Sequence, residues 1–445
     1  MKPLRNLVLL LFTPIHVLGN PLVLPLSENQ QQQRPLSSTP SSTPVDPNVL
    51  RHKPPNPGDG VSPSFFASLE RLSRLVDVAY CVGTTGVSKP FSCASRCKDF
   101  PTLQLVRTWN TGILMSDSCG YIAVDHSKDS SQRGIVLAFR GTYSLTNTIV
   151  DLSTVPQEYV PYPEDPDDPD NGGGDGDGDG DGKNGNKCRN CTVHMGFMES
   201  WRVAREVVLP SLKALREKYP EYPVRMVGHS LGGAVAALAA LELRIGLGWE
   251  DVIVTTFGEP RIGNQELADY LDQAFGLKDN ETGMAGENWA YRRVTHVGDP
   301  VPLLPLTEWG FRSHAGEVFI TKSDLQPAPE DLRICHGDND PECLGGAEME
   351  TNSWGWLGWV IGRSRREKHD VVTARLLEDD DEEAVRTGGF PARFKLWQLL
   401  FAHRDYFWRL GLCLPGGDPA DWGREKYNST LGSANENYDD EIRDL

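Results

Sequence analysis

Residues 224–233 read V-R-M-V-G-H-S-L-G-G, and residues 234–243 continue with A-V-A-A-L-A-A-L-E-L. The first four residues form a short apolar run with two β-branched members, which is typical of a buried strand. The second stretch is rich in Ala and Leu and predicts a helix. Gly228 and Gly232 flank Ser230 at two residues on either side. Small residues at these positions allow a tight strand-to-helix turn that leaves the serine hydroxyl exposed.

The helix predicted after this turn would begin directly behind Ser230. Its first backbone N–H groups, starting with that of Leu231, have no partner within the helix and lie at the positive end of the helix dipole. They would face the place where an oxyanion forms. Strand, glycine turn and helix together indicate the nucleophile elbow of an α/β-hydrolase rather than a glycine-rich turn with an incidental serine.

The segments around the elbow alternate between helix and strand patterns. Helices are expected at 65–81 and 198–218, and strands at 120–126, 134–139, 251–257 and 290–296. The strands at 120–126 and 134–139 form a predicted hairpin. The alternation from 198 to 296 predicts an α/β fold with a mostly parallel central sheet, flanking helices and surface insertions.

A serine nucleophile needs a histidine base, and that histidine needs a carboxylate to fix its tautomer. In α/β-hydrolases the chain order is Ser, acid, His, with the acid and the His on loops after strands. Asp299 follows the predicted strand 290–296 in a Pro-flanked loop and is the candidate acid. The order leaves four histidines as candidate bases: His314, His336, His369 and His403. We choose His403, which begins the last apolar segment, and regard His314 as the alternative or as a structural histidine.

The stretch F-R-G-T at 139–142 ends a predicted strand in a glycine turn. A hydrolase of this type needs its second oxyanion donor at such a turn, so Thr142 joins Leu231 as the expected oxyanion hole. The segment that follows predicts a short amphipathic helix, with an ordinary core-facing turn as the alternative. Its apolar side consists of Leu145, Ile149, Val150 and Leu152.

The chain has 445 residues and a formal net charge of -18. This acidic balance argues against nucleic acid as a partner. Alternating Asp and Gly at 163–187 suggests calcium, but an EF-hand loop counted from Asp177 places Cys188 instead of Glu at its closing position. A low-complexity acidic insertion is therefore favoured over an ordered calcium site, and we expect no metal and no cofactor.

The two ends of the chain differ in composition from its middle. Residues 1–19 have the basic start and short apolar run of a secretory signal, too short to span a membrane. Residues 20–63 are rich in Gln, Ser, Thr and Pro and predict a disordered leader or propeptide. The hydrolase domain is expected at 64–415, with a second insertion at about 335–391, and a flexible tail at 416–445. We expect a secreted protein whose nine cysteines form disulfides and leave one unpaired.

Six stretches together resemble the fungal class 3 triacylglycerol lipases. They are F-R-G-T at 139–142, H-M-G-F-M-E-S-W at 194–201, G-H-S-L-G-G at 228–233, F-G-E-P-R-I-G-N at 257–264, V-T-H-V-G-D-P-V-P at 294–302 and A-H-R-D-Y-F at 402–407. The resemblance implies Ser230, Asp299 and His403 as the triad and Thr142 and Leu231 as the oxyanion hole. It also implies that the segment from Thr142 to about Leu152 is a lid over the site.

The resemblance further implies disulfides of Cys81 with Cys413, Cys93 with Cys97, and Cys188 with Cys191. We add Cys335 with Cys343 and leave Cys119 free. The chain departs from the family in three places. Thr148 stands where several relatives have tryptophan, the acidic segment after the lid is an insertion, and the second insertion separates Asp299 from His403 by more than in compact members.

The activity implied by the resemblance is cleavage of triacylglycerol esters through an acyl-enzyme at a lipid–water interface, with no protein partner. The apolar lid favours a lipase, because a feruloyl-type or other carboxylesterase of soluble substrates would have a more polar lid. Phospholipase A1 and acyltransferase activity use the same machinery and stay open. The complete set of serine, acid and histidine argues against a non-catalytic binding module on this fold.

Overall fold

The structure is a computed structural model in which seven ranges are described, all within the unit that spans residues 51–445: 60–112, 118–142, 156–159, 188–277, 286–338, 340–344 and 402–427. Several predicted features lie outside them: the signal, nearly all of the leader, the acidic insertion, most of the second insertion, and the lid residues Leu145, Ile149, Val150 and Leu152. Within the seven ranges, no helix is both long and apolar enough to cross a membrane.

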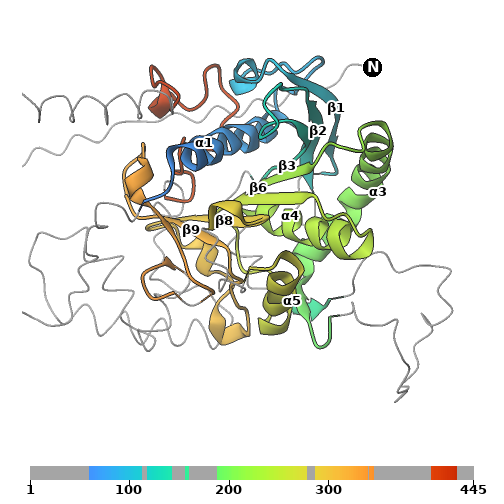
Figure 1. Cartoon of the computed structure of the whole chain (residues 1–445), viewed down its shortest axis with the longest axis vertical. Coiled ribbons are helices and arrows are strands. Elements are labelled where there is room, and N and C mark those ends of the chain that lie inside the picture. Colours follow the sequence, from blue (N-terminus) through green and yellow to red (C-terminus); the bar gives the residue numbers. More distant parts are fainter. Residues whose placement is uncertain are drawn as a thin grey trace, which may run out of the picture. The chain divides into compact units, whose positions relative to one another are not determined.

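An eight-stranded sheet forms the centre of the described part, in the order β1-β2-β3-β6-β7-β8-β9-β10 (Figure 1). The strands are β1 Leu103–Asn110, β2 Cys119–Asp125, β3 Gly134–Phe139, β6 Val224–His229, β7 Val252–Phe257, β8 Tyr291–His296, β9 Glu317–Ile320 and β10 Leu332–Ile334. Strands β3, β6, β7, β8 and β9 pair in parallel. The edge strands β1 and β10 and the second strand, β2, pair antiparallel with their neighbours. The predicted hairpin corresponds to β2 and β3, and the mostly parallel sheet is confirmed.

Helices cover both faces of this sheet. They are α1 Pro63–Val78, α3 Met195–Lys218, α4 Leu231–Leu241 and α5 Gln265–Phe275. Helix α1 lies on one face, whereas α3, α4 and α5 lie on the other (Figure 1). This arrangement confirms the predicted α/β-hydrolase fold.

Strand β3 shows why its sequence is apolar throughout. Ile135 and Leu137 pack in the core that contains α3, α4 and α5. Val136 and Ala138 pack in the core that contains α1. Successive side chains of a strand point to opposite faces, so a strand covered on both faces has no position for a solvated residue.

A second, two-stranded antiparallel sheet of β4 Pro156–Glu158 and β5 Thr192–His194 lies outside the main sheet. Strand β5 leads directly into α3, where the His194 side chain accepts the Gly196 N–H as an N-cap. Val193 also forms an isolated bridge with Gly263, just before α5. Strand β5 is therefore held between the start of α3 and the start of α5.

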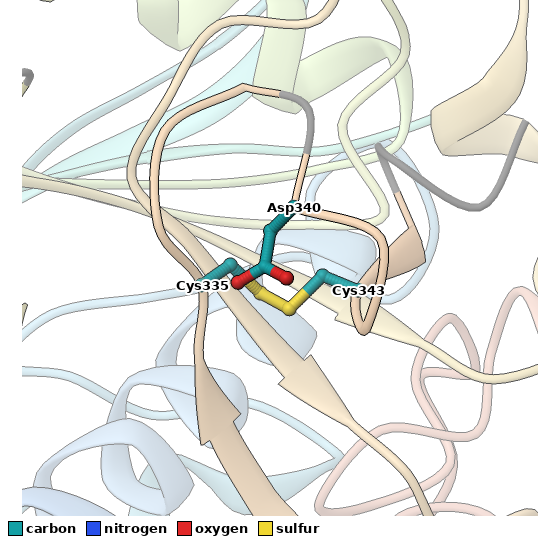
Figure 2. A group of neighbouring side chains, drawn as sticks. All are labelled: Cys335, Asp340 and Cys343. Carbon is teal, nitrogen blue, oxygen red and sulfur yellow. A yellow bond between two sulfur atoms is a disulfide. The ribbon is translucent and has the colours of Figure 1, made fainter. Parts of the chain in front are cut away.

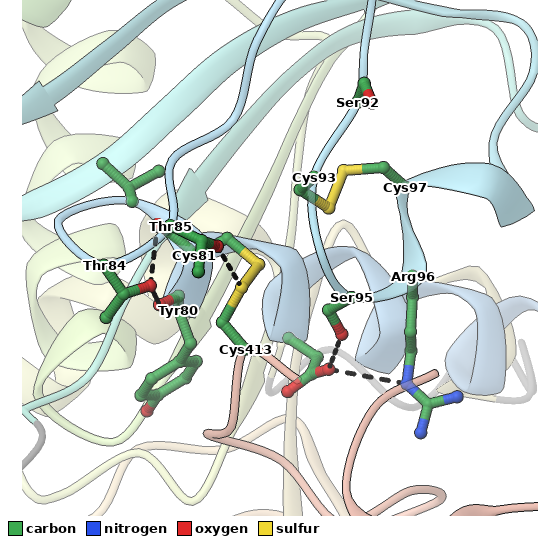
Figure 3. The surroundings of a disulfide bond; sticks show 12 residues. Tyr80, Cys81, Thr84, Thr85, Ser92, Cys93, Ser95, Arg96, Cys97 and Cys413 are labelled. Carbon is green, nitrogen blue, oxygen red and sulfur yellow. Dashed lines mark hydrogen bonds and ion pairs between the residues drawn. A yellow bond between two sulfur atoms is a disulfide. The ribbon is translucent and has the colours of Figure 1, made fainter. Parts of the chain in front are cut away.

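Four disulfides link the eight paired cysteines: Cys81 with Cys413, Cys93 with Cys97, Cys188 with Cys191 and Cys335 with Cys343. Cys119 is buried and forms no disulfide. Figure 3 shows the first two pairs, with Cys413 brought against η1 (Ala79–Cys81) at the end of α1. The Cys81–Cys413 disulfide joins residues separated by 332 positions.

Residues 416–427, the first part of the expected tail, pack against the α1 side of the domain. The Asp421 carboxylate lies 2.7 Å from Nη2 of Arg96. The guanidinium groups of Arg96 and Arg424 lie 4.1 Å and 4.3 Å from the Trp408 ring. These partners are distant in sequence, so the polar composition of the segment does not reveal them.

We expect the double variant C81S/C413S to lose about 4 kcal/mol of unfolding free energy, because the bridge closes a very long loop of the unfolded chain. Urea unfolding of the purified variants measures this difference. The matched control is C119S, which removes a thiol without removing a bridge and should cost about 1 kcal/mol or less. Equal unfolding midpoints for C81S/C413S and the unchanged protein would contradict the expectation.

Candidate active site

Ser230 occupies the turn between β6 and α4. Its φ of 57° and ψ of -132° are a strained combination for a residue with a side chain. A Cβ added to Gly228 would lie 2.2 Å from the Gly232 carbonyl oxygen, and a Cβ added to Gly232 would lie 2.5 Å from the Phe139 carbonyl oxygen. The Ser230 N–H donates to the Phe257 carbonyl at 2.9 Å. Both glycines are therefore required by close backbone approach, and neighbouring strands hold the strained serine in place.

The sequence predicts an exposed Ser230 hydroxyl, and this expectation is wrong in the structure. Ser230 has 0% of its surface exposed. The turn after β3 passes directly over it: a Cβ added to Gly141 would lie 2.8 Å from the Ser230 Cβ and 2.5 Å from the Tyr80 hydroxyl. Tertiary contacts with segments distant from the elbow therefore bury a hydroxyl that the local turn alone would present to solvent.

Asp299 and His403 contact each other although 104 residues separate them. His403 Nδ1 lies 2.9 Å from Oδ2 and 3.0 Å from Oδ1 of Asp299. Asp299 also accepts the Tyr406 hydroxyl at 2.5 Å and the Val301 N–H at 2.9 Å. Asp299 and His403 are both buried, and the carboxylate accepts from three residues, His403, Tyr406 and Val301.

Burial by itself would raise the pKa of Asp299. The interaction with the His403 charge and the hydrogen bonds from His403, Tyr406 and Val301 outweigh burial, and together they hold the pKa below its ordinary value. The carboxylate therefore stays ionised at neutral pH. An ionised acceptor at Nδ1 keeps a proton on that nitrogen and leaves Nε2 of His403 free to accept one.

Eight buried side-chain atoms have no hydrogen-bond partner among the described residues, and two of them have the chemistry of a nucleophile–base pair. They are Ser230 Oγ and His403 Nε2. Buried polar groups are rarely left unpaired, so such atoms call for an explanation in function. The two residues are linked by His229, whose ring stacks on that of His403 with 4.7 Å between centroids.

His229 joins the elbow to the segment that carries His403. Its Nε2 lies 2.8 Å from the His403 carbonyl oxygen, and its Nδ1 lies 2.5 Å from the Tyr80 hydroxyl. A carbonyl only accepts, so Nε2 carries the proton and Nδ1 accepts from Tyr80. Burial, followed by the charge of His403, lowers the pKa of His229 to about 3. His229 therefore adds no positive charge beside His403 near neutral pH.

The sequence gives little signal for Tyr80, His229 or Tyr406. His229 is conspicuous only as the neighbour of Ser230, and Tyr406 only as the third residue after His403. Tyr80 lies 149 positions before His229. Contacts of this range depend on the folded sheet and cannot be read from local patterns.

The predicted oxyanion donors come from the two segments that enclose Ser230. Leu231 is buried and is the first residue of α4, where backbone N–H groups lack partners within the helix. Thr142 follows Gly141, whose Cα approaches both Ser230 and the His229 carbonyl. Strand β3, which ends just before Gly141, pairs in parallel with β6, which ends just before Ser230.

His314, the alternative base, belongs to a different buried cluster. Its Nε2 lies 3.0 Å from Oε1 of Glu259, and its Nδ1 lies 2.7 Å from the Ala315 carbonyl. Both ring nitrogens are therefore engaged away from Asp299. Of the other two candidates, His336 lies beside the Cys335–Cys343 bridge, and His369 lies outside the described residues.

Two groups of side chains in the described ranges have the spacing of metal ligands. In the first, Cys335, Asp340 and Cys343, the two sulfur atoms are bonded to each other and are not thiolates (Figure 2). In the second, Asp269 and Asp338 are bridged by the Gln265 amide. The third member, Asp272, accepts the Ala315 N–H at 2.8 Å.

We expect the unfolding free energy to fall with acidification below about pH 6.5, partly through His229. Its pKa is about 3 in the folded protein, against about 6.5 in an unfolded chain. The stability that this histidine contributes is therefore complete above pH 6.5 and is lost progressively between pH 6.5 and 3, at roughly 1 to 2 kcal/mol per pH unit. Urea unfolding at pH 7, 6 and 5 measures the slope.

The comparison for this slope is H229Q, whose amide can still donate to the His403 carbonyl but does not titrate. We expect the H229Q slope to be smaller by the equivalent of about one proton. Identical slopes for H229Q and the unchanged protein would mean that His229 is protonated in both states or in neither.

Comparison with known proteins agrees with this geometry. The profile of the family described as "Lipase (class 3)" matches residues 136–309. The chain is 57% identical over 386 residues to "Secreted mono- and diacylglycerol lipase 2" of Gibberella zeae, covering 84% of this chain and 89% of the relative. It is also 57% identical over 376 residues to "Lipase A" of Sodiomyces alcalophilus, covering 82% of this chain and 86% of that relative. The crystal structure of Lip2 lipase from Yarrowia lipolytica has a TM-score of 0.59 at 25% identity, covering 80% of this chain and 97% of that one.

The profile match includes most of β3, the elbow and Asp299, and the two relatives extend the similarity to more than four fifths of each chain. Similarity of this extent and identity reflects common descent. The chain therefore belongs to the class 3 lipase family.

Proposed function

We propose that the protein is a secreted lipase that hydrolyses acylglycerol esters through an acyl-enzyme on Ser230. One observation carries the proposal: the buried Asp299–His403 pair lies beside the strained serine turn, and Ser230 Oγ and His403 Nε2 are both unpaired among the described residues. The relatives named as lipases support the same activity and the extracellular location.

The first half of the reaction forms the acyl-enzyme. His403 Nε2 takes the proton of Ser230 Oγ as the oxygen attacks the ester carbonyl. The resulting oxyanion is held by the N–H groups of Leu231 and Thr142, each worth about 3 kcal/mol of transition-state stabilisation. His403 then gives the proton to the glycerol oxygen, which leaves as the free alcohol.

The second half releases the fatty acid. Water loses a proton to His403 Nε2 and attacks the acyl carbonyl, and the same oxyanion donors stabilise the intermediate. Collapse of this intermediate returns the proton to Ser230 Oγ. Throughout, Asp299 stays ionised and stabilises the imidazolium that forms twice per turnover.

Three further side chains position this machinery without touching the ester. Tyr406 donates to Asp299 and so limits the rotation of the carboxylate. His229 donates from Nε2 to the His403 carbonyl, and its ring stacks on that of His403. Tyr80 donates to Nδ1 of His229 and so fixes the tautomer of this histidine. Because His229 stays neutral, it does not oppose the positive charge that develops on His403.

The substrate class is an ester of glycerol with fatty acids. One relative carries the name "Secreted mono- and diacylglycerol lipase 2", so partial acylglycerols are expected as substrates alongside the triacylglycerols inferred from the sequence. We further propose that the enzyme acts at a lipid–water interface, without a nucleic-acid or protein partner.

The test is hydrolysis of emulsified monoolein, diolein and triolein, followed by titration of the released fatty acid. The proposal expects release from acylglycerols that rises when the substrate exceeds its solubility and forms an interface. An emulsion without enzyme measures the uncatalysed background, and the S230A variant shows how much of the release depends on the Ser230 hydroxyl. Cleavage of soluble feruloyl esters together with no release from any acylglycerol would instead support the alternative esterase function.

A further inference from the structure

We propose that Asn190 is a site of N-linked glycosylation. Residues 190–192 read N-C-T, an acceptor pattern of Asn followed two residues later by Thr, with no proline between. Such a pattern is used only where the asparagine reaches the surface of a protein that passes through the secretory pathway. The proposed function supplies that route but does not itself require the modification.

The fold leaves Asn190 accessible at the surface, as glycosylation requires. It lies in the turn between Cys188 and β5 and is exposed. Its φ of 59° is left-handed, a conformation that asparagine accepts more readily than most residues. The turn is closed on both sides by the Cys188–Cys191 disulfide. The asparagine is thus an exposed residue of a turn that a disulfide closes.

The backbone around Asn190 is fixed, whereas its side chain is not. The Asn190 carbonyl accepts Nδ2 of Asn264 at 2.8 Å, and the Thr192 N–H donates to Oδ1 of Asn264 at 2.9 Å. No hydrogen bond of the Asn190 side-chain amide occurs within the described part of the chain. A sugar on this amide would therefore displace no contact that the fold uses, and Asn264 would continue to brace the turn.

The modification is a group transfer with a defined balance. Nδ2 of Asn190 attacks C1 of the reducing-end sugar of a lipid-linked oligosaccharide diphosphate, which the host secretory pathway supplies. The C1–Nδ2 bond forms as the bond from C1 to the diphosphate oxygen breaks. The diphosphate leaves with the electron pair, and Nδ2 gives up one proton to a base of the host transferase. No atom changes its oxidation state in a way that needs a further reactant.

Two other acceptor patterns occur in the chain. These are N-E-T at 280–282 and N-S-T at 428–430, both outside the described residues. Total sugar content alone would not tell the three apart. The test must therefore detect the modification at Asn190 itself.

The experiment is secretion of the full chain from a eukaryotic host, followed by enzymatic release of N-glycans in H₂¹⁸O. After reduction, alkylation and trypsin digestion, mass spectrometry reads the peptide 190–202, which begins after Arg189. We expect residue 190 to be converted to ¹⁸O-labelled aspartate in most molecules. An unconverted asparagine at 190 in secreted, active enzyme would overturn the proposal.

Variants separate the acceptor pattern from other causes of conversion. T192A should abolish labelling at residue 190, and T192S, which keeps the required hydroxyl, should retain it. N190Q should remove one glycan and leave hydrolysis of a soluble short-chain ester unchanged within about twofold, since Asn190 takes no part in catalysis. Labelling that persists in T192A would overturn the proposal, because it would arise from spontaneous deamidation.

Discussion

The S230A variant is expected to lose ester hydrolysis by a factor of roughly 10⁶ in kcat. Removal of the hydroxyl leaves His403 without a group to deprotonate, and no acyl-enzyme can form. The oxyanion donors stay in place, so residual hydrolysis by directly bound water should exceed the uncatalysed rate by about 10³. Initial rates on a soluble p-nitrophenyl ester measure the loss, because this assay needs no lipid interface.

S211A is the matched control for this substitution. Ser211 lies on α3, and its hydroxyl donates to the Val207 carbonyl one helical turn earlier. This contact is remote from the Asp299–His403 pair, so we expect S211A to keep its activity within about twofold. Retention of more than a hundredth of the activity by S230A would indicate a different nucleophile.

The D299N variant is expected to lose about 10⁴ in kcat while remaining folded. Asparagine has nearly the same shape but offers one oxygen and one NH₂ group. Its amide either donates toward Nδ1 of His403, which moves the imidazole proton to Nε2, or turns its NH₂ group toward the donors Tyr406 and Val301. In both cases the neutral side chain no longer stabilises the imidazolium.

D405N controls for the loss of a carboxylate in the same region. Asp405 lies two residues after His403 and pairs with Arg409 at 2.5 Å. We expect D405N to retain kcat within a few-fold and to lose roughly 1 to 3 kcal/mol of unfolding free energy, because Asp405 is buried and accepts two hydrogen bonds from Arg409. Rates for D299N within tenfold of the unchanged enzyme would exclude Asp299 as the carboxylate partner of the base.

The elements closest to the elbow can be predicted from the sequence because the patterns that indicate them are local. An apolar β-branched run, two glycines and an Ala-rich run suffice to predict β6, the turn and α4. The same holds for β3 and β7, whose apolar runs follow from burial on both faces of a parallel sheet. Asp299 is accessible as well, since it follows a predicted strand in a Pro-flanked loop.

The remaining features depend on contacts between distant segments. The exposed hydroxyl expected for Ser230 was wrong because the turn at Gly141, about 90 positions earlier in the chain, packs over it. The link from Tyr80 through His229 to the His403 carbonyl joins three segments that no local pattern connects. The packing of Asp421 on Arg96 spans 325 positions. Periodicity predicts which face of an element is buried, but not which distant residue covers it.

Covalent labelling tests the central claim most directly. Diethyl p-nitrophenyl phosphate reacts with a serine only when a base activates it and an oxyanion site holds the phosphoryl oxygen. We expect one diethylphosphoryl group per molecule, located by peptide mass spectrometry on Ser230, with loss of activity in proportion to labelling and much slower labelling in D299N. An adduct on another residue, or an active enzyme that stays unlabelled at Ser230, would contradict the proposed triad.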